Sequence, residues 1–423
     1  MSAGQVPSVV FLNRFYAPDV AATAQMLSDL AEDLAATGWH VSVVTSQTPY
    51  ELHAADLPNE EVRAGVHVYR VSATRFGRNR IVGRMLDYVS YMAVSLVVLF
   101  RIPRPQLIVA MSDPPFILFP AVIAARLRGA AVCYWAQDVY PTLAAQLGVL
   151  DENKPMFKFL SAIARRLQRA CDLIVGLGPE MVKALVREGA PADRTICIHN
   201  WADEKAIRPI PPADNVFVIA NNLQGKFVVL YSGNAGRGHT FDSLCEVMFR
   251  FRNDERIVFV FIGAGRKSAE IRAYAADKNL SSAMFFDYLP RGELAYSLSA
   301  ASVSVVTEDP AVAGLLLPSK TYGILASGRP LVFIGAAESD VAHIVRSTQC
   351  GIVVWHDDPD ALEGAIRRLA NDAPECARMG QASRRAAETT YSRERAAEMW
   401  SSALTAVLSS ELDDARDQSP SVK

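Results

Sequence analysis

Short apolar runs alternate with amphipathic segments along nearly the whole chain. In the first half, "SVVFLN", "HVSVVTS", "QLIVAMS", "AAVCYWA" and "CDLIVGLG" have the length and β-branched content of buried strands. Between them, "ATAQMLSDLAEDLAATG" carries apolar residues at helical spacing and ends on Gly38. Repeated alternation of strand and helix predicts an α/β fold, in which parallel sheets are covered by helices on both faces.

The alternation pauses at residues 208–226, where prolines and asparagines accumulate, and it resumes with "FVVLYSG", "RIVFVFIG", "SVSVVTE" and "PLVFIG". Two similar Rossmann-like domains are therefore predicted, an N-terminal one at residues 1–208 and a C-terminal one at 209–392. A final apolar helix is expected at 393–410. The polar tail at 411–423 is expected to be disordered.

The composition is typical of a cytoplasmic globular protein. Of the 423 residues, 50% are hydrophobic and 21% are charged, and the net charge of −2 gives no reason to expect a nucleic acid partner. The six cysteines form no CxxC pair, which favours reduced thiols over a zinc site or a disulfide framework. The longest uncharged apolar run, Tyr88 to Phe100, falls short of the roughly 18 residues that indicate a membrane span.

Two strand exits in the C-terminal domain are rich in glycine. In "VVLYSGNAGRGHTF" a strand ends and a helix begins within a few residues, and in "FIGAGRKSAEI" the pattern recurs. Glycines allow the backbone to approach a ligand closely, and an arginine matches the geometry of phosphate oxygens. The alternative is a tight turn with a solvated arginine. The candidate ligand-binding residues in these loops are Gly233, Asn234, Gly236, Arg237, Gly263 and Gly265.

A third loop, "GLLLPSKTYG", places a lysine at the start of a predicted helix. Pro318 can open the helix, and Ser319, Lys320 and Thr321 then fall in its first turn. A cation is unfavourable at a helix N-terminus unless an anion is nearby, although the lysine can instead extend into solvent. Together the three loops predict a nucleotide or diphosphate site. Neither a P-loop nor a complete GxGxxG pattern is present.

In this order, the loops resemble those of family-4 retaining glycosyltransferases of GT-B fold, with a closer likeness to the WbuB-like enzymes of bacterial O-antigen and exopolysaccharide biosynthesis. The segments that carry the resemblance are "LYSGNAGRGHTFDSL", "LPSKTYGILASGRPLV" and "SDPPFILFPAVIAARLRGAAVCYWAQDVYP". It extends over about residues 8 to 408. Many members of the family carry two glutamates where this chain has Leu315 and Gly323, so the sugar or ribose contact is unassigned.

The resemblance implies two Rossmann-like domains that face a cleft, with the last helix crossing back to the N-terminal domain. It implies a nucleotide-sugar donor on the C-terminal domain, an acceptor on the N-terminal one, and no metal or other cofactor. Asp138, in "YWAQDVYP", is expected to orient the acceptor hydroxyl or the donor sugar, unless it only shapes the turn before Pro141. Arg237 and Lys320 are expected to stabilise the leaving diphosphate. Substrate contacts are also expected from Asn13, Leu317, Ser319 and Thr321.

The expected function is transfer of a sugar from a nucleotide-diphosphate sugar, UDP-linked by preference, to a polyprenyl-diphosphate-linked sugar. Two alternatives are a non-hydrolysing UDP-sugar 2-epimerase and a catalytically idle subunit of a polysaccharide complex. The apolar run from Tyr88 to Phe100 follows a cluster of arginines, which suits a helix lying on an anionic membrane surface, at the inner face of the plasma membrane. A buried helix is the alternative. The arginines of the cluster are Arg75, Arg78, Arg80 and Arg84.

Overall fold

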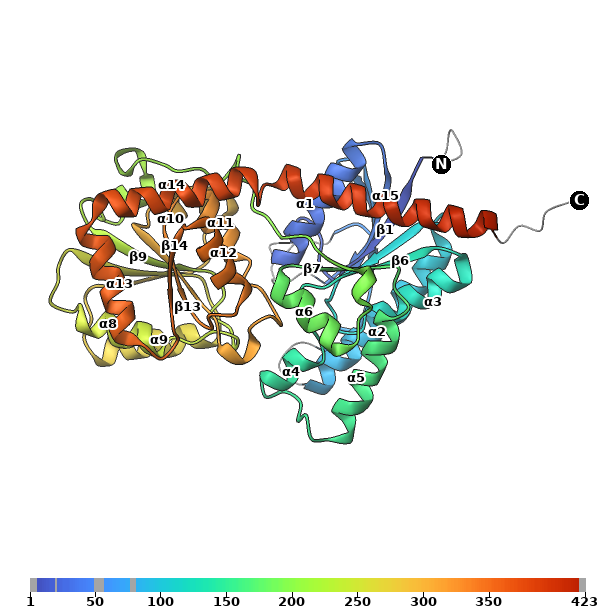
Figure 1. Ribbon diagram of the computed structural model, residues 1–423, viewed down its shortest axis with the longest axis horizontal. Coiled ribbons are helices and arrows are strands. Elements are labelled where there is room, and N and C mark those ends of the chain that lie inside the picture. Colours follow the sequence, from blue (N-terminus) through green and yellow to red (C-terminus); the bar gives the residue numbers. More distant parts are fainter. Residues whose placement is uncertain (1–5, 20, 49–56, 77–80, 418–423) are drawn as a thin grey trace, which may run out of the picture. The chain divides into compact units, whose positions relative to one another are not determined.

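The computed structural model describes residues 6–19, 21–48, 57–76 and 81–417 (Figure 1). Arg78 and Arg80 of the predicted basic cluster lie outside this range. Internal contacts divide the chain into two compact units, Met1–His199 with Ala396–Lys423, and Asn200–Arg395. The first unit therefore ends nine residues before the boundary that the sequence suggests.

The first unit contains an eight-stranded sheet with the order β3-β4-β2-β1-β5-β6-β7-β8. All neighbouring strands are parallel except β3 and β4. The order reverses direction between β1 and β5, and the carboxyl ends of strands at such a switch point commonly bind ligands. The strands are β1 (Ser8–Leu12), β2 (His40–Ser46), β3 (Glu60–Arg63), β4 (Val66–Val71), β5 (Leu107–Ala110), β6 (Ala131–Trp135), β7 (Leu173–Gly176) and β8 (Thr195–Cys197).

The helices of this unit begin and end where the sequence provides the usual signals. Pro179 occupies the first turn of α6, and Gly189 ends it in the left-handed region, with φ of 106°. Gly129 ends α3 in the same way. The helices are α1 (Ala22–Ala36), α2 (Ile81–Arg101), α3 (Leu118–Arg128), α4 (Thr142–Gln146), α5 (Pro155–Gln168) and α6 (Pro179–Glu188).

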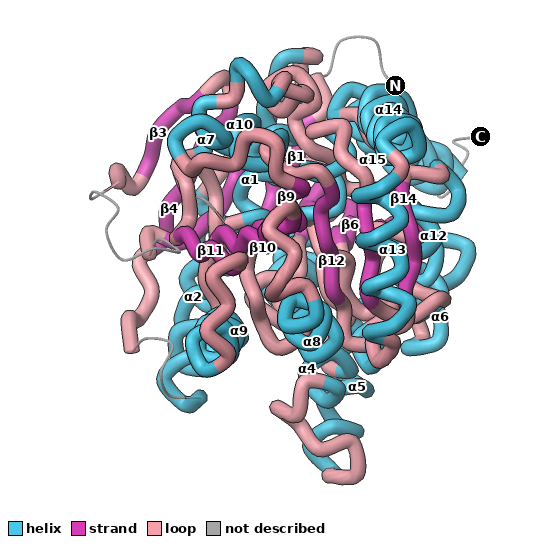
Figure 2. Tube along the Cα trace, turned by 90° about the vertical axis from the view of Figure 1, so that its left-hand side faces the viewer, coloured by secondary structure: helices cyan, strands magenta, loops and turns pink. Residues whose placement is uncertain are grey.

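The second unit contains a six-stranded sheet, all parallel, with the order β11-β10-β9-β12-β13-β14. Its switch point lies between β9 and β12. In Figure 2 the strands of this sheet (magenta) are seen with helices such as α8, α9 and α13 (cyan) around them. The strands are β9 (Phe227–Ser232), β10 (Ile257–Ile262), β11 (Ala283–Phe286), β12 (Val303–Thr307), β13 (Leu331–Ile334) and β14 (Gly351–Val354).

Apolar strands and amphipathic helices form the core of the second unit. Val247 of α8, Phe259 of β10 and Leu362 of α13 belong to one fully buried cluster. Asp358 caps α13, because its side chain accepts a hydrogen bond from the amide of Ala361. The helices are α7 (Val216–Ala220), α8 (Asp242–Arg250), α9 (Arg266–Asp277), α10 (Leu294–Ser299), α11 (Lys320–Ala326), α12 (Asp340–Thr348), α13 (Pro359–Asn371) and α14 (Ala373–Thr389).

The last helix, α15 (Arg393–Asp417), is longer than expected. The sequence "ELDDARD" was predicted to be disordered, but it contains strong helix formers and no stop signal, and the helix continues through it. From Ala396 onward the helix belongs to the first unit. There Trp400 packs against Trp135 of β6, with ring centroids 4.8 Å apart, and both side chains are buried.

Helix α2 is also longer than the apolar run measured on the sequence. It is the one helix of the described part that is long and apolar enough to cross a membrane by length and composition, and 22% of its apolar window is buried. A stripe from Asp87 through Tyr91 to Leu99 is buried, and the Tyr91 hydroxyl donates to the carbonyl of Val44 on β2 (3.1 Å). The opposite face of the helix is exposed, although its side chains are more apolar than those of the buried stripe. Its large side chains are Val82, Met85, Leu86, Val89, Val97 and Phe100.

Candidate active site

The exits from β9 and β10 interlock through their glycines. Gly263 and Gly265 have φ of 119° and 129°. A Cβ on Gly263 would lie 2.5 Å from the carbonyl oxygen of Gly233, and one on Gly265 would lie 2.5 Å from Asn234 Oδ1. The space that these two glycines leave is therefore filled by the neighbouring loop, rather than kept open for a ligand. Asn234 is exposed, and Gly236 has no backbone atom crowding its Cβ position.

Lys320 lies directly beside the β9 exit. Its Nζ donates a hydrogen bond to the hydroxyl of Tyr231 and lies 3.9 Å from the centroid of that ring. The carbonyl of Asn234 is 3.4 Å away. Gly233 is needed for this approach, because a Cβ there would come within 3.2 Å of Lys320 Cε. Burial lowers the pKa of Lys320 to about 7, so the cation has lost part of its hydration.

Two more side chains of the β9–α8 loop contribute to this site. Arg237 is exposed and makes no side-chain hydrogen bond or ion pair with any described residue. His239 Nδ1 lies 2.5 Å from the carbonyl oxygen of Thr307, which can only accept, so Nδ1 carries the proton. Burial and the charge of Lys320 lower the pKa of His239 to about 3. His239 is therefore neutral and leaves Nε2 as an acceptor, a role that the sequence had not suggested.

The segment around α11 corrects part of the sequence prediction. Thr321 is fully buried, and its backbone amide donates to the carbonyl of Pro318 (3.1 Å). Neither its side-chain hydroxyl nor its amide is therefore available to a ligand. Leu317 is also buried, whereas Ser319 is partly exposed. The reason is that α11 packs against β12, β13 and α14, which takes up most of its first turn.

Leu315 and Gly323 occupy the two positions at which many members of the family carry glutamates, and neither position is open to solvent as a carboxylate would require. Leu315 is buried. A Cβ on Gly323 would lie 3.3 Å from Leu298 Cδ1, so this position faces α10. A carboxylate at position 323 would have to displace Leu298, and one at position 315 would be buried. The sites are therefore adapted to the residues that they hold.

Glu308 and Asp309, which follow β12, have separate structural roles. Asp309 caps a short 3-10 helix by accepting from the amide of Ala311 (3.0 Å). Glu308 is buried, and burial together with the nearby charge of Asp340 raises its pKa to about 8. Glu308 is therefore not a surface carboxylate, because its side chain is buried in the protein.

In the first unit, Asn13 follows β1 as predicted but is completely buried. Its Nδ2 donates to the carbonyl of Phe15 (2.7 Å), which fixes the turn after the strand. The next residue, Arg14, packs its guanidinium between the rings of Phe15 and Tyr88, at 5.2 and 5.1 Å. Asn13 therefore shapes this loop through its Nδ2, while its buried Oδ1 has no hydrogen-bond partner among the described residues.

Asp138 lies at the carboxyl end of β6, next to the end of β5. Its amide donates to Ser112 Oγ (3.1 Å), which also accepts from the amide of Gln137. The Asp138 carboxylate accepts no hydrogen bond from a described residue, which argues against a purely turn-forming role. Burial, and then the charge of Asp113, raise its pKa to about 7. Sequence reasoning missed Ser112 and Asp113, although both come within three residues of the end of the buried strand β5.

Comparison with known proteins agrees with this architecture. Residues 22–201 match the family model described as a glycosyl transferase 4-like domain, and residues 214–386 match the model of glycosyl transferases group 1. The chain is a two-domain glycosyltransferase. It is 26% identical over 297 residues to the glycosyltransferase WbjE of Pseudomonas aeruginosa, covering 70% of this chain and 74% of that protein. It is 24% identical over 364 residues to the colanic acid biosynthesis glycosyl transferase WcaI of Escherichia coli K12, covering 83% and 88%.

Solved structures show the same fold as this glycosyltransferase. Sucrose-phosphate synthase of Thermosynechococcus elongatus superimposes with a TM-score of 0.76 at 17% identity, over 96% of this chain and 100% of that one. HepE of Anabaena, solved in complex with UDP-glucose, gives 0.71 at 14% identity, over 94% and 99%. Two Rossmann-like domains of GT-B type are thereby confirmed. These matches do not favour the epimerase alternative, and the likeness to WbuB-like enzymes stays a prediction.

Proposed function

We propose that this glycosyltransferase moves a sugar from a UDP-sugar to a sugar carried on polyprenyl diphosphate, with retention of configuration, in bacterial surface polysaccharide biosynthesis. The observation that supports a nucleotide-sugar donor is the contact of Lys320 Nζ with Tyr231 and with the carbonyl of Asn234 at the β9 exit. In the same loop, Arg237 is exposed and unpaired among the described residues. The names of WcaI and of the UDP-glucose complex of HepE support the substrate class.

The chemistry requires a stabilised leaving group. Breaking a glycosyl–phosphate bond places negative charge on the departing diphosphate, and preorganised cations stabilise that charge without reorganisation. Lys320, held by Tyr231, and Arg237 supply this charge, so we propose that no metal is required. The leaving phosphate oxygen takes the proton of the acceptor hydroxyl on the same face of the sugar. A carboxylate nucleophile of the type that retaining glycosidases use is then unnecessary.

Asp138 is proposed to orient the acceptor hydroxyl. A partly exposed carboxylate that accepts no hydrogen bond from described residues is available to accept one from a substrate. Its pKa of about 7 makes it half ionised at neutral pH. The ionised form is the better hydrogen-bond acceptor, so the proposed role predicts faster transfer above pH 7 than below it.

We propose that the exposed apolar face of α2 contacts the membrane that carries the lipid-linked acceptor. A face that is more apolar than the opposite, buried stripe has no reason to be exposed in water unless a partner or a membrane covers it. Arg101 and Arg104, at the carboxyl end of this helix, and Arg75, in the segment that packs along it, are exposed, and cations favour an anionic leaflet. We therefore place the protein in the cytoplasm, peripheral to the inner face of the plasma membrane.

A labelled-transfer assay tests the proposal. The full-length protein is incubated with radiolabelled UDP-sugars and a bacterial membrane extract, with and without EDTA. Label that becomes lipid-soluble supports transfer, and label that stays soluble as an epimeric UDP-sugar supports the isomerase. A parallel thermal-shift panel of UDP, GDP, ADP and CMP identifies the nucleotide, because a ligand that binds the folded state raises the melting temperature. No transfer and no shift would contradict the proposal.

A further inference from the structure

His239 lies at the switch point of the second sheet, where the exit of β9 meets the exit of β12. Its Nδ1 donates to the carbonyl of Thr307 at the end of β12 (2.5 Å), and the amide of Asp309 donates to the carbonyl of Gly238 (2.9 Å). Figure 2 shows β9 and β12 as neighbours in the sheet. The two hydrogen bonds therefore hold the loop and its imidazole at the place where parallel sheets commonly bind their ligands.

Aromatic contacts fix the orientation of the imidazole. The ring of His239 lies edge-on to that of Tyr231, with centroids 6.2 Å apart, and its centroid is 6.3 Å from that of Phe241. Lys320 Nζ lies over the same Tyr231 ring, 3.9 Å from its centroid. The histidine is therefore a neighbour of the lysine that is proposed to contact the diphosphate. Groups of the donor that lie next to the diphosphate come close to the imidazole.

The second nitrogen of His239 is an acceptor without a protein partner. Because Nδ1 carries the proton, Nε2 has a lone pair, and it makes no hydrogen bond with a described residue. The side chain is partly exposed. Burial and the charge of Lys320 lower the pKa of His239 to about 3, so the ring is neutral above pH 5. Nε2 therefore suits a hydroxyl that donates, and it has no proton to offer to a phosphate oxygen.

The donor presents hydroxyls at this place, and carboxylates that could accept from them are absent or engaged. A nucleotide-diphosphate sugar carries hydroxyls on both sides of its diphosphate, on the ribose and on the transferred sugar. Leu315 and Gly323 supply no acceptor. Glu308 is buried, and the Asp309 carboxylate caps a 3-10 helix. A donor hydroxyl that loses water without gaining a partner would weaken binding, so it requires another acceptor.

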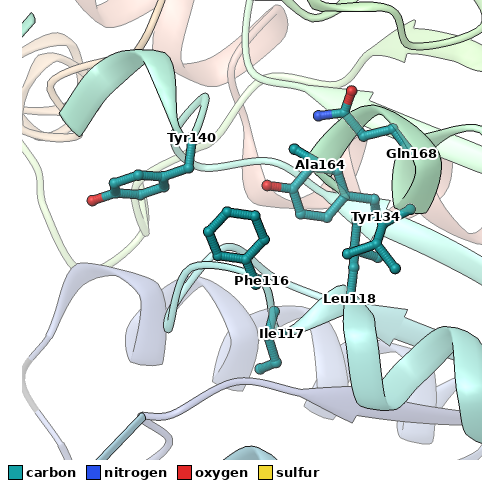
Figure 3. Close-up of a pocket in the computed structure, with 8 residues that line it drawn as sticks. Phe116, Ile117, Leu118, Tyr134, Tyr140, Ala164 and Gln168 are labelled. Carbon is teal, nitrogen blue, oxygen red and sulfur yellow. The ribbon is translucent and has the colours of Figure 1, made fainter. Parts of the chain in front are cut away.

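An enclosed acceptor of the first unit shows why exposure matters. Gln168 Oε1 also lacks a partner among the described residues, but this side chain is only 3% exposed. In Figure 3 the oxygen points away from the cavity that Phe116 and Tyr134 line, and that cavity has room for only about one or two water molecules. Gln168 Oε1 therefore meets water at most, whereas the partly exposed His239 is accessible to a larger ligand.

We propose that His239 Nε2 accepts a hydrogen bond from a donor hydroxyl adjacent to the diphosphate, and so takes the place of the glutamates that this chain lacks. The inference rests on the proposed function, because it names a contact within the proposed donor site. The Thr307 carbonyl fixes the tautomer, which makes Nε2 an acceptor. His239 is thereby a specificity-determining residue, since a site built to pair a hydroxyl discriminates against a donor that lacks it.

Two substitutions separate the two nitrogens of the ring. In His239→Asn the short amide can still donate to the Thr307 carbonyl, but no atom replaces Nε2. In His239→Gln the longer amide places its oxygen near the position of Nε2. Calorimetry at pH 7 measures the affinity of each full-length protein for UDP, UDP-glucose, UDP-galactose and UDP-N-acetylglucosamine. The matched control is His343→Asn, because His343 is an exposed histidine on α12 of the same unit.

We expect His239→Asn to bind at least one of these probes about tenfold more weakly than wild type, while His239→Gln and His343→Asn stay within about twofold of it. The set of probes affected identifies the hydroxyl. Weaker binding of UDP itself indicates the ribose, whereas weaker binding of a UDP-sugar alone indicates the transferred sugar. His239→Asn that binds every probe as wild type does would overturn the inference.

Long-range ¹H–¹⁵N NMR of wild type labelled with ¹⁵N-histidine gives a second measurement that needs no variant ligand complex. The Nε2 signal of His239, assigned by its absence from His239→Gln, should move when the donor binds and remain that of a neutral ring from pH 6 to 8. An imidazolium signal in the complex would mean that the ring donates to phosphate and would overturn the inference, as would an unmoved Nε2 signal. UDP binding by wild type leaves the proposed donor site standing in those cases, and a wild type that binds no probe rejects both.

Discussion

The pH dependence of UDP binding offers a direct test of Lys320. Burial lowers the pKa of this lysine to about 7, so the free protein changes from mostly cationic to mostly neutral between pH 6 and 8. A diphosphate beside Nζ favours the ammonium form, and the bound protein therefore keeps the proton to a higher pH. Binding above pH 7 must take up a proton. The affinity for UDP should consequently fall as the pH rises.

The size of the effect follows from linkage. One linked proton changes the binding free energy by at most about 1.4 kcal/mol per pH unit, and because the charge itself contributes only about 30-fold, the Kd should rise about fourfold from pH 7 to 8 and about threefold from pH 8 to 9. A fully charged contact to phosphate contributes on the order of 2 kcal/mol, or about 30-fold. With half of Lys320 protonated at pH 7, Lys320→Gln should weaken UDP binding about 15-fold there. At pH 9 the two proteins should bind almost equally.

Isothermal titration calorimetry at pH 7, 8 and 9 measures the UDP affinity of wild type and of Lys320→Gln. Repeating the titrations in buffers with different ionisation enthalpies gives the number of protons taken up. Lys278→Gln is the control, because Lys278 pairs with Asp277 (3.0 Å) and follows the last turn of α9, whose first turn is at the site. It should leave affinity and proton uptake unchanged. Wild-type affinity that stays constant from pH 7 to 9 without proton uptake would refute the assignment of Lys320 to the diphosphate.

Three other outcomes are expected, one in the second unit and two in the first. Arg237→Ala should weaken UDP binding by on the order of 2 kcal/mol at every pH, measured by the same calorimetry, and leave the melting temperature unchanged. Asp138→Asn should lower kcat far more than it raises the KM of the donor, and should remove the rise in turnover through pH 7. Replacing four arginines by glutamine should abolish low-salt binding to anionic liposomes in a sedimentation assay, while UDP binding is retained. Those four are Arg75, Arg78, Arg80 and Arg84.

Much of the fold was predictable because it is encoded locally. Apolar runs and helical spacing identified the alternation of strands and helices, and the glycine-rich loops identified which strand exits are unusual. Polar composition alone does not predict the length of α15, because such composition is typical of disorder, whereas "ELDDARD" consists of residues that tolerate a helix. The extent of α2 was missed for a similar reason, since the run from Tyr88 excluded the charged first turns of the same helix.

The site itself was only partly predictable, because its contacts join residues far apart in the chain. Nothing near Lys320 in the sequence indicates that Tyr231, 89 residues earlier, will hold its Nζ. Burial is equally nonlocal: Thr321 and Asn13 have polar side chains at strand or helix ends, yet the packing around them leaves both inaccessible. Residue type and spacing thus identified the loops, whereas the choice of side chain within each loop required the structure.

The distribution of ion pairs separates the candidate donor site from the rest of the second unit. On its helical surface, Arg250 pairs with three carboxylates, and Arg368 pairs with Glu375. At the β9 exit, Lys320 and Arg237 pair with no described carboxylate, and Lys320 is held by a neutral phenol instead. A carboxylate partner would have competed with an incoming diphosphate for the same cation. Retaining a partly desolvated lysine on Tyr231 keeps its charge positioned but unneutralised, which is the arrangement that an anionic leaving group requires.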